Sequence, residues 1–474
     1  MILPFILSVI AGGLFVFLVN YGWTFVAYIG RGLANSWPTK YRPAEDPKNN
    51  HIQIIVLGDI GRSPRMQYHA ISVAKHGKKV DIVALKETAR HPELIGNPNA
   101  TLYPLDPLPE WLAWGNLNFI IQIPGKVIHQ FWTLFHTIMY TAPAAEWIII
   151  QNPPSIPTFH VALFVAWIRG SKVIIDWHNY GHTILAQKGK LYSPLVPLYR
   201  WYEFFFGRRL CNVNLAVTDA MTQQLQAGKF ELRKPVYTLH DRPPAIFQAI
   251  TSRKEREEVL MRIPETQSQA QDILDGNVRL IVSSTSWTAD EDFSILLSAL
   301  VAYAGPREVD DESEPPSPIL AIITGKGPQR KMYLDKIKEL TDGGQLPGIK
   351  VVSAWLSNRD YAQLLAAADL GISLHKSSSG VDLPMKVVDM FGAGLPVVAY
   401  SKFESFGELV KEGVNGCGFE TASELNLLFK RLLASDGAEE LAILKKGAIK
   451  EGSLRWDEEW DRVVAPLVGL GKGE

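Results

Sequence analysis

Short runs of β-branched and aromatic residues alternate with helical patterns along most of the chain, and this alternation constrains the fold most strongly. In the first half it predicts strands at 52–57, 80–85, 147–150, 173–176, 214–217 and 235–239, with helices at 66–75 and 158–168. In the second half it predicts strands at 280–283, 319–324, 349–352, 370–373 and 396–399, with helices at 294–303, 361–367 and 386–391. Strands that alternate with helices form parallel sheets, so we expect an α/β fold.

The length of the chain implies more than one domain. A chain of 474 residues exceeds the ~250–300 residues at which a single hydrophobic core stops growing. Residues 251–276 are rich in charged residues and glutamine and lack a strand pattern, so we place the connection between the domains there. The two predicted Rossmann-like domains are 51–250 and 277–474, and the acidic, proline-rich run 306–318 is a solvated loop inside the second.

The first thirty residues predict a membrane anchor. No residue from Ile2 to Gly30 is charged, and the run exceeds the ~20 residues that cross a hydrocarbon core. A cleaved signal peptide would carry basic residues ahead of a shorter run, whereas here Arg31 and Lys40 follow it. We therefore expect one transmembrane helix at 1–30, a linker at 31–50, and both domains on the cytoplasmic side.

Two aromatic segments of the first domain allow two interpretations. The segments are 111–140, interrupted by Pro124 and Gly125, and 199–209, which contains three arginines. Tryptophan, tyrosine and arginine are typical of helices that lie at the headgroup level of a bilayer. Short apolar runs are equally typical of buried helices, so both interpretations stay open.

The charge balance and the cysteines exclude several classes of function. The chain has 48 basic and 49 acidic side chains, a net charge of -1, so we expect no nucleic-acid partner. Cys211 and Cys417 are far apart and lack zinc-ligand spacing. The acidic triplet 290–292 precedes a helical pattern and suits its dipole, so we assign no metal site, although a divalent cation can still assist.

A glycine-rich turn follows the first predicted strand, in the order Gly58-Asp59-Ile60-Gly61-Arg62-Ser63-Pro64-Arg65. Backbone N–H groups at such a turn, together with the start of the next helix, suit a phosphate. Arginine pairs with phosphate through two hydrogen bonds. The alternative is an ordinary tight turn. We predict an anion site formed by Gly58, Gly61, Arg62 and Arg65.

The second domain carries a lysine turn and a longer motif. Lys326 lies in a glycine turn at the end of a strand, where open α/β sheets bind ligands, although an exposed lysine in a turn is equally possible. The stretch 377–398 places a serine and glycine loop before a helix that contains Lys386 and Asp389. The loop and the start of the helix suit a diphosphate, and Asp389 suits a ribose.

These motifs resemble the GT-B glycosyltransferases, which have two facing Rossmann-like domains. Asp382, Asp389 and the turn Gly394-Leu395-Pro396-Val397 look like the acidic pair and Gly-x-Pro-Val strand of that family. Aspartate stands where glutamate is more usual, and one residue fewer separates the acids. The closer resemblance is to the chitobiosyldiphosphodolichol β-mannosyltransferases, on the stretches 57–69 (LGDIGRSPRMQYH), 176–181 (DWHNYG), 283–293 (SSTSWTADEDF) and 382–398 (DLPMKVVDMFGAGLPVV).

The resemblance implies a reaction, its partners and a location. Mannose would pass from GDP-mannose, in β-1,4 linkage and with inversion, to GlcNAc2-diphosphodolichol at the cytoplasmic face of the endoplasmic reticulum membrane. The acceptor diphosphate would meet the Gly58 to Arg65 turn, and other transferases of the same pathway are possible partners. The expected donor site contains Ser284, Thr285, Lys326, Gly380, Asp382, Lys386 and Asp389.

Two residues are candidates for the general base that takes the proton of the acceptor hydroxyl. Asp59 and His178 both follow strands of the first domain, where a base can reach the acceptor. We favour His178, because an ordinary histidine pKa of ~6.5 needs little adjustment. Its alternative is a histidine that only fixes its loop.

Three other functions compete with this interpretation. A retaining GT-B transferase on another lipid-linked acceptor would use the same acidic pair. A non-catalytic membrane adaptor is disfavoured by the retained cations Arg62, Arg65, Lys326 and Lys386 and by Asp389. A nucleotide-sugar epimerase ranks last, because its GxGxxG fingerprint is missing.

Overall fold

The computed structural model describes residues 39–112, 119–227, 230–288, 291–305 and 316–470. The predicted anchor at 1–30 and most of the predicted acidic loop lie outside these ranges. Within them, no helix has both the length and the apolar character that a bilayer span requires. The described residues form two compact units: unit 1 comprises those within 39–216, 222–237 and 464–470, and unit 2 comprises those within 217–221 and 238–463.

Unit 1 is built on a seven-stranded sheet with the order β3-β2-β1-β4-β5-β6-β7. The pairs from β3 to β6 are parallel. Strands β1 and β4 lie at the centre and contain continuous apolar runs, as expected for strands covered on both faces. The strands are β1 (His51–Asp59), β2 (Lys79–Leu85), β3 (Ala100–Pro104), β4 (Trp147–Asn152), β5 (Lys172–Trp177), β6 (Val213–Ala216) and β7 (Val236–Thr238).

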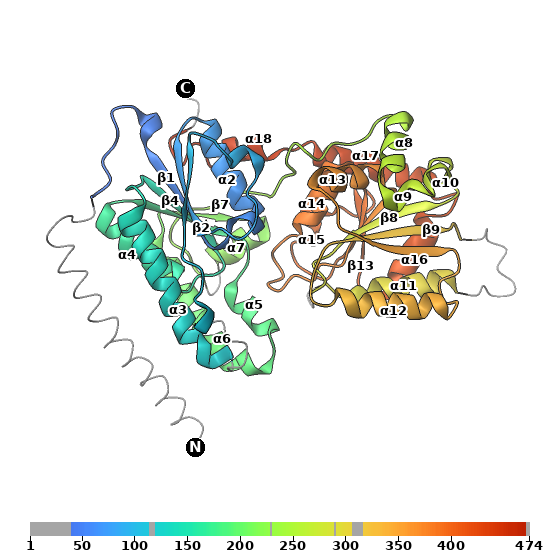
Figure 1. Cartoon of the computed structure of the whole chain (residues 1–474), viewed down its shortest axis with the longest axis horizontal. Coiled ribbons are helices and arrows are strands. Elements are labelled where there is room, and N and C mark those ends of the chain that lie inside the picture. Colours follow the sequence, from blue (N-terminus) through green and yellow to red (C-terminus); the bar gives the residue numbers. More distant parts are fainter. Residues whose placement is uncertain (1–38, 113–118, 228–229, 289–290, 306–315, 471–474) are drawn as a thin grey trace, which may run out of the picture. The chain divides into compact units, whose positions relative to one another are not determined.

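The helices of unit 1 follow the strands in the order that a doubly wound sheet requires. Helix α4 packs against both α3 and α6 (Figure 1). The helices are α2 (Pro64–Lys75), α3 (Phe119–His136), α4 (Thr158–Arg169), α5 (Gly181–Gln187), α6 (Val196–Leu210) and α7 (Asp219–Gln226). Shorter helical turns are η1 (Pro47–Asn49), η2 (Ile60–Arg62), η3 (Pro92–Leu94), η4 (Glu110–Leu112), η5 (Thr137–Thr141) and η6 (Lys190–Leu195).

Unit 2 has a six-stranded, wholly parallel sheet with the order β10-β9-β8-β11-β12-β13. Its strands are β8 (Arg279–Ser284), β9 (Ile319–Thr324), β10 (Ile349–Ala354), β11 (Leu370–Ser373), β12 (Val397–Tyr400) and β13 (Gly416–Phe419). Its helices are α8 (Arg253–Arg262), α9 (Pro264–Gln267), α10 (Ala270–Asp275), α11 (Phe293–Ala304), α12 (Arg330–Asp342), α13 (Asn358–Ala367), α14 (Met385–Gly392), α15 (Phe406–Leu409), α16 (Ala422–Leu432), α17 (Ala438–Gly452) and α18 (Trp456–Val463).

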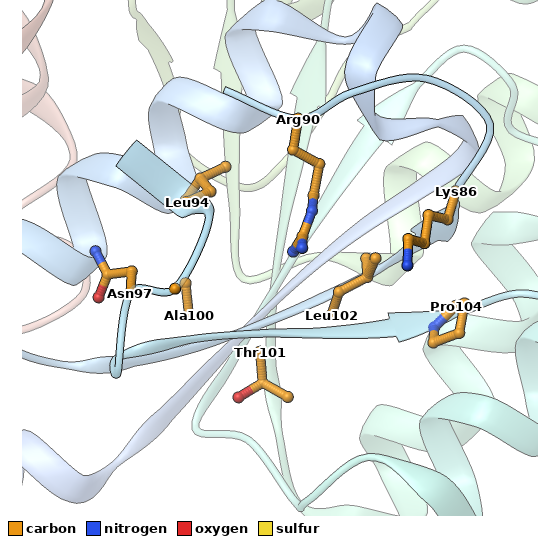
Figure 2. Close-up of a pocket in the computed structure, with 9 residues that line it drawn as sticks. Lys86, Arg90, Leu94, Asn97, Ala100, Thr101, Leu102 and Pro104 are labelled. Carbon is orange, nitrogen blue, oxygen red and sulfur yellow. The ribbon is translucent and has the colours of Figure 1, made fainter. Parts of the chain in front are cut away.

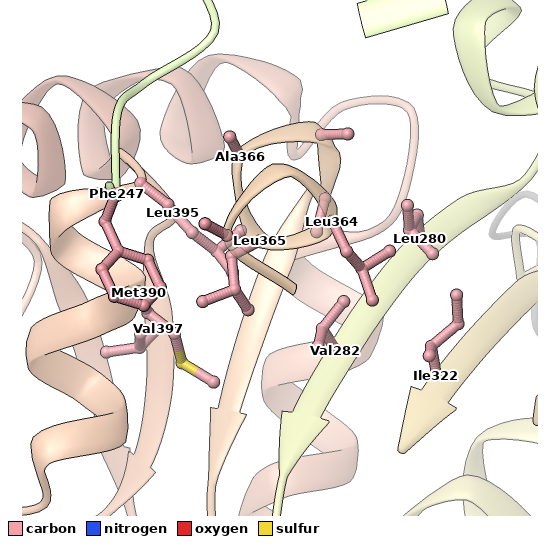
Figure 3. Packing of buried hydrophobic residues seen from close by; sticks show 14 of the residues in the cluster. Phe247, Leu280, Val282, Ile322, Leu364, Leu365, Ala366, Met390, Leu395 and Val397 are labelled. Atoms are coloured by element: carbon pink, nitrogen blue, oxygen red, sulfur yellow. The ribbon is translucent and has the colours of Figure 1, made fainter. Parts of the chain in front are cut away.

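The core on one face of the unit 2 sheet includes the segment that we expected to connect the domains. Figure 3 shows this core, where Phe247 and Met390 pack near side chains of the sheet. Residues 251–276 contain α8, α9 and α10, and Val259, Leu260 and Ile273 are buried in the same core. The charged and glutamine residues cover the outer sides of these helices, so the segment is a folded part of unit 2.

The structure contains two strands that the sequence pattern did not indicate. Strand β3 is short and ends in a proline, and β13 has the sequence Gly-Cys-Gly-Phe, so neither presents a β-branched run. Both are edge strands of their sheets. Proline in β3 and the two glycines of β13 are residues that strands usually lack, which explains why the pattern is weaker in these two strands.

The two aromatic segments of unit 1 differ in exposure: one is buried at its end, like a core helix, and the other exposes large apolar side chains. In α3, Leu134 and Phe135 are buried, so the end of this helix belongs to the core of unit 1. In α6, Leu198 and Trp201 are 60% and 56% exposed. Neighbouring α4 exposes 77% of Trp167.

Candidate active site

The first turn of unit 1 is organised around the carboxylate of Asp59, at the end of β1. Its Oδ1 accepts hydrogen bonds from the backbone N–H groups of Glu87 at 3.0 Å and Thr88 at 3.2 Å. The Thr88 hydroxyl donates to Oδ2, and the Gly61 N–H donates to Oδ1 at 3.4 Å. Burial acts to raise the pKa of Asp59, but the hydrogen bonds outweigh it and lower the pKa. The ionised carboxylate thus joins this turn to the loop after β2.

The two glycines of the turn differ in their surroundings. A Cβ on Gly61 would lie 2.2 Å from Oγ1 of Thr88 and 2.6 Å from the carbonyl oxygen of Ala89. No described atom lies within 4 Å of a Cβ built on Gly58. Gly61 therefore has a packing reason to be glycine, and the phosphate role of both residues stays a prediction.

The two arginines of the turn have different accessibility. The Arg62 side chain is 72% exposed, with its Nε 3.6 Å from Oδ2 of Asp59. Arg65 is 2% exposed and binds Asp176 through two hydrogen bonds, Nε to Oδ2 at 2.8 Å and Nη2 to Oδ1 at 2.9 Å. Such a two-point pair fixes the guanidinium in the interior of unit 1. Arg62 can meet a ligand, whereas Arg65 is committed to Asp176.

Asp176, at the end of β5, is fully buried and has two further partners. Nε2 of His69 lies 3.2 Å from its Oδ2, and Nε2 of His178 lies 2.7 Å from the same oxygen. Burial alone would raise the pKa of Asp176, but the charge of Arg65 and the contacts with His178 and His69 hold it well below its usual range. Asp176 is therefore an ionised carboxylate at the edge of the sheet.

This arrangement orients the ring of His178. The side chain is 21% exposed, and its Nε2 faces Asp176. Among the described residues, Nδ1 of His178 has no hydrogen-bond partner. A carboxylate that holds one ring nitrogen while the other is open to a substrate is the arrangement found in general-base catalysis.

The loop that carries His178 is fixed by a second buried carboxylate, Glu203 of α6. It accepts hydrogen bonds from the backbone N–H groups of Gly181 at 2.8 Å and His182 at 3.2 Å. Its Oε2 also lies 2.7 Å from Nδ1 of His182, and Nδ2 of Asn152 donates to Oε1 at 3.3 Å. Glu203 gave no signal in the sequence, because it lies in an aromatic helix remote from any motif.

In unit 2, the loops after β8 and β9 approach each other closely. Gly325 has a φ of 124°, and a Cβ there would lie 1.8 Å from the carbonyl oxygen of Thr285. A Cβ on Gly327 would lie 1.7 Å from the carbonyl oxygen of Ser286. Both glycines are required by this backbone contact. The contact places the Lys326 turn beside the serine and threonine loop.

Lys326 rests on an aromatic side chain that the sequence analysis missed. Its Nζ lies 4.0 Å from the ring centroid of Trp355, which follows β10 and is 65% exposed. A lysine over an indole ring is stabilised by the negative face of the ring. The indole orients the Lys326 ammonium group at the carboxyl edge of the sheet.

Lys386, in the first turn of α14, meets the middle residue of the acidic triplet. Its Nζ donates to Oε1 of Glu291, and it donates to the Ser286 hydroxyl at 3.0 Å. Glu291 is 6% exposed, whereas Lys386 is 30% exposed. The ammonium group is therefore held in place and remains open to solvent on one side.

The hydroxyls expected to bind the donor are engaged within unit 2. The Ser284 hydroxyl lies 2.8 Å from the hydroxyl of Tyr361, and burial raises the pKa of Tyr361. The Thr285 hydroxyl donates to Oε2 of Glu291 at 2.7 Å. Thr285 thereby helps to hold Glu291, the partner of Lys386, and the donor contacts of Ser284 and Thr285 stay predictions.

Asp382 organises the loop before α14. Nε2 of His375 lies 3.1 Å from Oδ2 of Asp382, and the Ser379 hydroxyl donates to Oδ1 at 3.2 Å. Burial acts to raise the pKa of Asp382, but the contact with His375 and the Ser377 hydroxyl lower it. The N–H of Gly380, whose φ is 81°, donates to the Ser377 hydroxyl at 2.8 Å. The polar groups of this loop therefore hydrogen-bond to one another and to His375.

Asp389 differs from the other acids of the site, because its proton is held tightly. Desolvation is the main cause that raises its pKa to about 8, with a further contribution from the charge of Asp241, while Lys386 acts in the opposite direction. A carboxyl group with such a pKa, on the helix that carries Lys386, is typical of a functional site.

Among the described residues, one group of side chains has the geometry of a metal site, namely Asp219, His240 and Glu408. The pKa of His240 is raised to about 9: burial lowers it, but hydrogen bonds to Glu408 and Glu459 outweigh burial. A protonated imidazole is an ion-pair partner and lacks the lone pair that a metal needs.

Asp292, the last residue of the acidic triplet, caps a helix. Its carboxylate accepts the N–H of Ser294 at 3.2 Å and pairs with Lys376 at 2.9 Å.

The sequence is similar to those of three named proteins. It is 46% identical over 380 residues to the chitobiosyldiphosphodolichol β-mannosyltransferase of Arthroderma benhamiae, covering 80% of this chain and 84% of that protein. It is 40% identical over 444 residues to the human protein of the same name, covering 88% and 92%. A relative from Arabidopsis thaliana, 36% identical over 466 residues and covering 89% and 97%, is named the UDP-glycosyltransferase TURAN.

The family model and solved structures agree on the fold. Residues 299–435 match the family described as glycosyl transferases group 1. The Anabaena protein HepE, solved with UDP-glucose, superposes with a TM-score of 0.60 at 16% identity and covers 89% of this chain and 100% of its own. The expected GT-B fold with two parallel sheets is confirmed.

We expect Asp389→Asn to stabilise the protein at neutral and alkaline pH. Because the folded-state pKa of about 8 exceeds the unfolded value of ~3.9, the folded state binds the proton more tightly. The wild type therefore loses stability as pH rises from ~4 to 8, and the variant does not. Thermal unfolding should show equal melting temperatures near pH 4 and a higher value for the variant near pH 8, by about 2–4 °C for each kcal/mol of stability that the wild type has lost.

Asp369→Asn is a matched control, since Asp369 is half-buried but paired with Arg256 at 2.6 Å. This control should lower the melting temperature. An Asp389→Asn melting temperature that stays equal to wild type across the whole pH range would contradict the raised pKa.

Proposed function

The chain belongs to the chitobiosyldiphosphodolichol β-mannosyltransferase family, and from this premise we propose that it transfers mannose from GDP-mannose to GlcNAc2-diphosphodolichol in β-1,4 linkage. The observation that carries the proposal is the cluster of Lys386, Glu291 and Asp389 in unit 2, in a chain 46% identical to a named member of the family. This reaction would be the first mannosylation of the lipid-linked precursor of N-glycans.

Unit 2 would bind the donor. Lys386 and Lys326 would neutralise the diphosphate of GDP-mannose, whose negative charge grows as GDP departs. Helix α14 begins at Met385 without a side-chain cap, so its first N–H groups are available to the same phosphates. Asp389 would accept a ribose hydroxyl. We assign no role to a tightly bound metal, because lysines supply the positive charge.

Unit 1 would supply the base for a single inverting displacement. The acceptor hydroxyl oxygen forms a bond to the anomeric carbon as the bond from that carbon to the diphosphate oxygen breaks. Nδ1 of His178 would take the hydroxyl proton, and Asp176 would stabilise the imidazolium that forms. Asp59 is the weaker candidate, since its lowered pKa makes it a poor proton acceptor.

We also propose that unit 1 rests on the cytoplasmic face of the endoplasmic reticulum membrane, next to an anchor in residues 1–30. Trp167 of α4 and Trp201 of α6 are 77% and 56% exposed. Arg209, also on α6, lies 4.1 Å from the ring centroid of Phe205. Exposed tryptophans beside arginines suit the headgroup region of a bilayer with anionic lipids.

The central experiment measures transfer of labelled mannose to a synthetic GlcNAc2-diphospho-lipid by wild type and Lys386→Ala, in the presence of EDTA. We expect wild type to use GDP-mannose and the variant to lose about 10²–10³-fold in kcat, as when one transition-state donor is removed. Lys331→Ala, an exposed lysine on α12, is the control and should keep full activity. Activity with UDP-sugars alone would favour the donor that the Arabidopsis relative's name states, and an α-linked product would indicate a retaining transferase.

His178→Ala tests the proposed base. We expect kcat to fall about 10²–10⁴-fold, the usual contribution of a general base, with the KM for GDP-mannose unchanged. His76→Ala, at the residue that follows α2 in the same unit, serves as the control. A variant that keeps the wild-type kcat and its pH profile would exclude His178 and leave Asp59 to be tested.

Flotation with vesicles that contain anionic phospholipid tests the membrane proposal. A chain that lacks residues 1–35 should still float. In this shortened chain, the double change Trp167→Ser and Trp201→Ser should reduce the floated fraction several-fold. Trp355→Ser, which removes an equally exposed indole from unit 2, is the matched control. Complete loss of flotation on removal of residues 1–35 would show that the anchor alone binds the membrane.

A further inference from the structure

A groove in unit 1 lies between strand β3 and the loop that follows β2. Its volume is about 440 Å³, within the range of small-ligand sites. Leu94 and Leu102 form part of its apolar lining, and Lys86 and Arg90 line it from the loop. Figure 2 shows the two cationic side chains reaching from the loop toward the side of β3 on which Leu102 lies. Thr101 points to the other side of the strand.

The two cations of the groove are not neutralised. Among the described residues, neither Lys86 nor Arg90 makes an ion pair or a hydrogen bond. This contrasts with Arg65, which is buried and bound to Asp176. In a chain of net charge -1, two unpaired cations that share one groove form a local anion site.

The loop that carries these cations is held at both ends. At its start, the N–H groups of Glu87 and Thr88 donate to Asp59. At its end, the N–H of His91 donates to Oε1 of Gln67 at 2.6 Å. Arg90 lies between these two attachments. The loop therefore presents its cations from a fixed backbone, which reduces the ordering cost of binding a ligand.

We propose that this groove, rather than the turn from Gly58 to Arg65 that the resemblance implied, binds the diphosphate of the lipid-linked acceptor, with Lys86 and Arg90 as its cationic contacts. The proposal rests on the proposed function, which brings two diphosphates to the enzyme. The donor diphosphate is assigned to the lysines of unit 2, so a diphosphate bound in unit 1 belongs to the acceptor. Asp59 acts in this scheme as a positioning residue, because its carboxylate fixes the loop rather than touching the ligand.

The test uses the full chain and the double variant Lys86→Gln/Arg90→Gln. A control, Arg42→Gln/Lys48→Gln, removes the same charge from two exposed positions of unit 1. Both are assayed with a GlcNAc2-diphospho-lipid and with the matching monophosphate. We expect the groove variant to raise the KM for the diphosphate acceptor roughly 5- to 30-fold, two exposed ion pairs being lost. The KM for GDP-mannose should stay unchanged.

The monophosphate acceptor separates a binding role from a merely structural one. Wild type should prefer the diphosphate acceptor, and the groove variant should lose most of that preference, whereas a distorted loop would weaken both acceptors equally. An acceptor KM equal to wild type, or an equal loss for both acceptors, would overturn the proposal.

A binding arm distinguishes failure of this inference from failure of the proposed function. Inorganic diphosphate is titrated by calorimetry into Lys386→Ala, in which the unit 2 site is weakened, with and without the groove substitutions. Weaker binding on substitution supports an anion site in the groove even if wild type transfers no mannose. Equal binding overturns the groove as an anion site. If the groove substitutions weaken the binding of inorganic diphosphate but leave the KM for the lipid acceptor unchanged, the groove binds a free anion, and the proposal that it binds the acceptor is overturned.

Discussion

The buried carboxylate of Asp176 is the interaction on which the functional edge of unit 1 depends. A fully buried charge is tolerated only when it is paired and hydrogen-bonded, and Asp176 meets this requirement through Arg65, His69 and His178. Loss of one partner would leave a buried charge uncompensated, at a cost of about 3–5 kcal/mol. The same pairing removes Arg65 from ligand binding and orients His178, so one carboxylate decides the roles of two candidate site residues.

Glu291 has the corresponding position in unit 2, with a different outcome. Its partner Lys386 is 30% exposed, whereas Arg65 is 2% exposed. An ion pair that is open on one side can accept a second anion without first being broken. Glu291 therefore orients Lys386, which remains accessible to a phosphate. The pair with Asp176 leaves Arg65 buried, so that Arg65 is not accessible to one. Burial of the cation, rather than its presence in a motif, separates a binding residue from a structural one.

The sequence predicted most strands of the two sheets because each strand has an apolar pattern within a few consecutive residues. The side chains that pair at the carboxyl ends of the strands are far apart in the sequence, so their pairing was not predicted. Continuous apolar runs identified the central strands, but the edge strands β3 and β13 carried too little apolar pattern. Arg65 and Asp176 are 111 positions apart, and Lys386 and Glu291 are 95 positions apart. Each residue lies in a motif that the sequence analysis found, but no spacing rule connects two motifs that meet only in the folded sheet. For the same reason Lys86 and Arg90, which belong to no motif, gave no signal.

The two candidate bases, Asp59 and His178, have different surroundings in the structure. A catalytic base needs a free lone pair and a pKa near the working pH. Asp59 does not meet the second requirement, because Thr88, Glu87 and Gly61 donate hydrogen bonds to its carboxylate and lower its pKa. His178 has one nitrogen held by Asp176, and its other nitrogen makes no hydrogen bond within the described part of the chain. The two candidates that sequence position could not separate thus differ in the number of donors around them. In the proposed reaction, the carboxylate of Asp59 therefore positions the loop of Lys86 and Arg90, and the imidazole of His178 would take the proton.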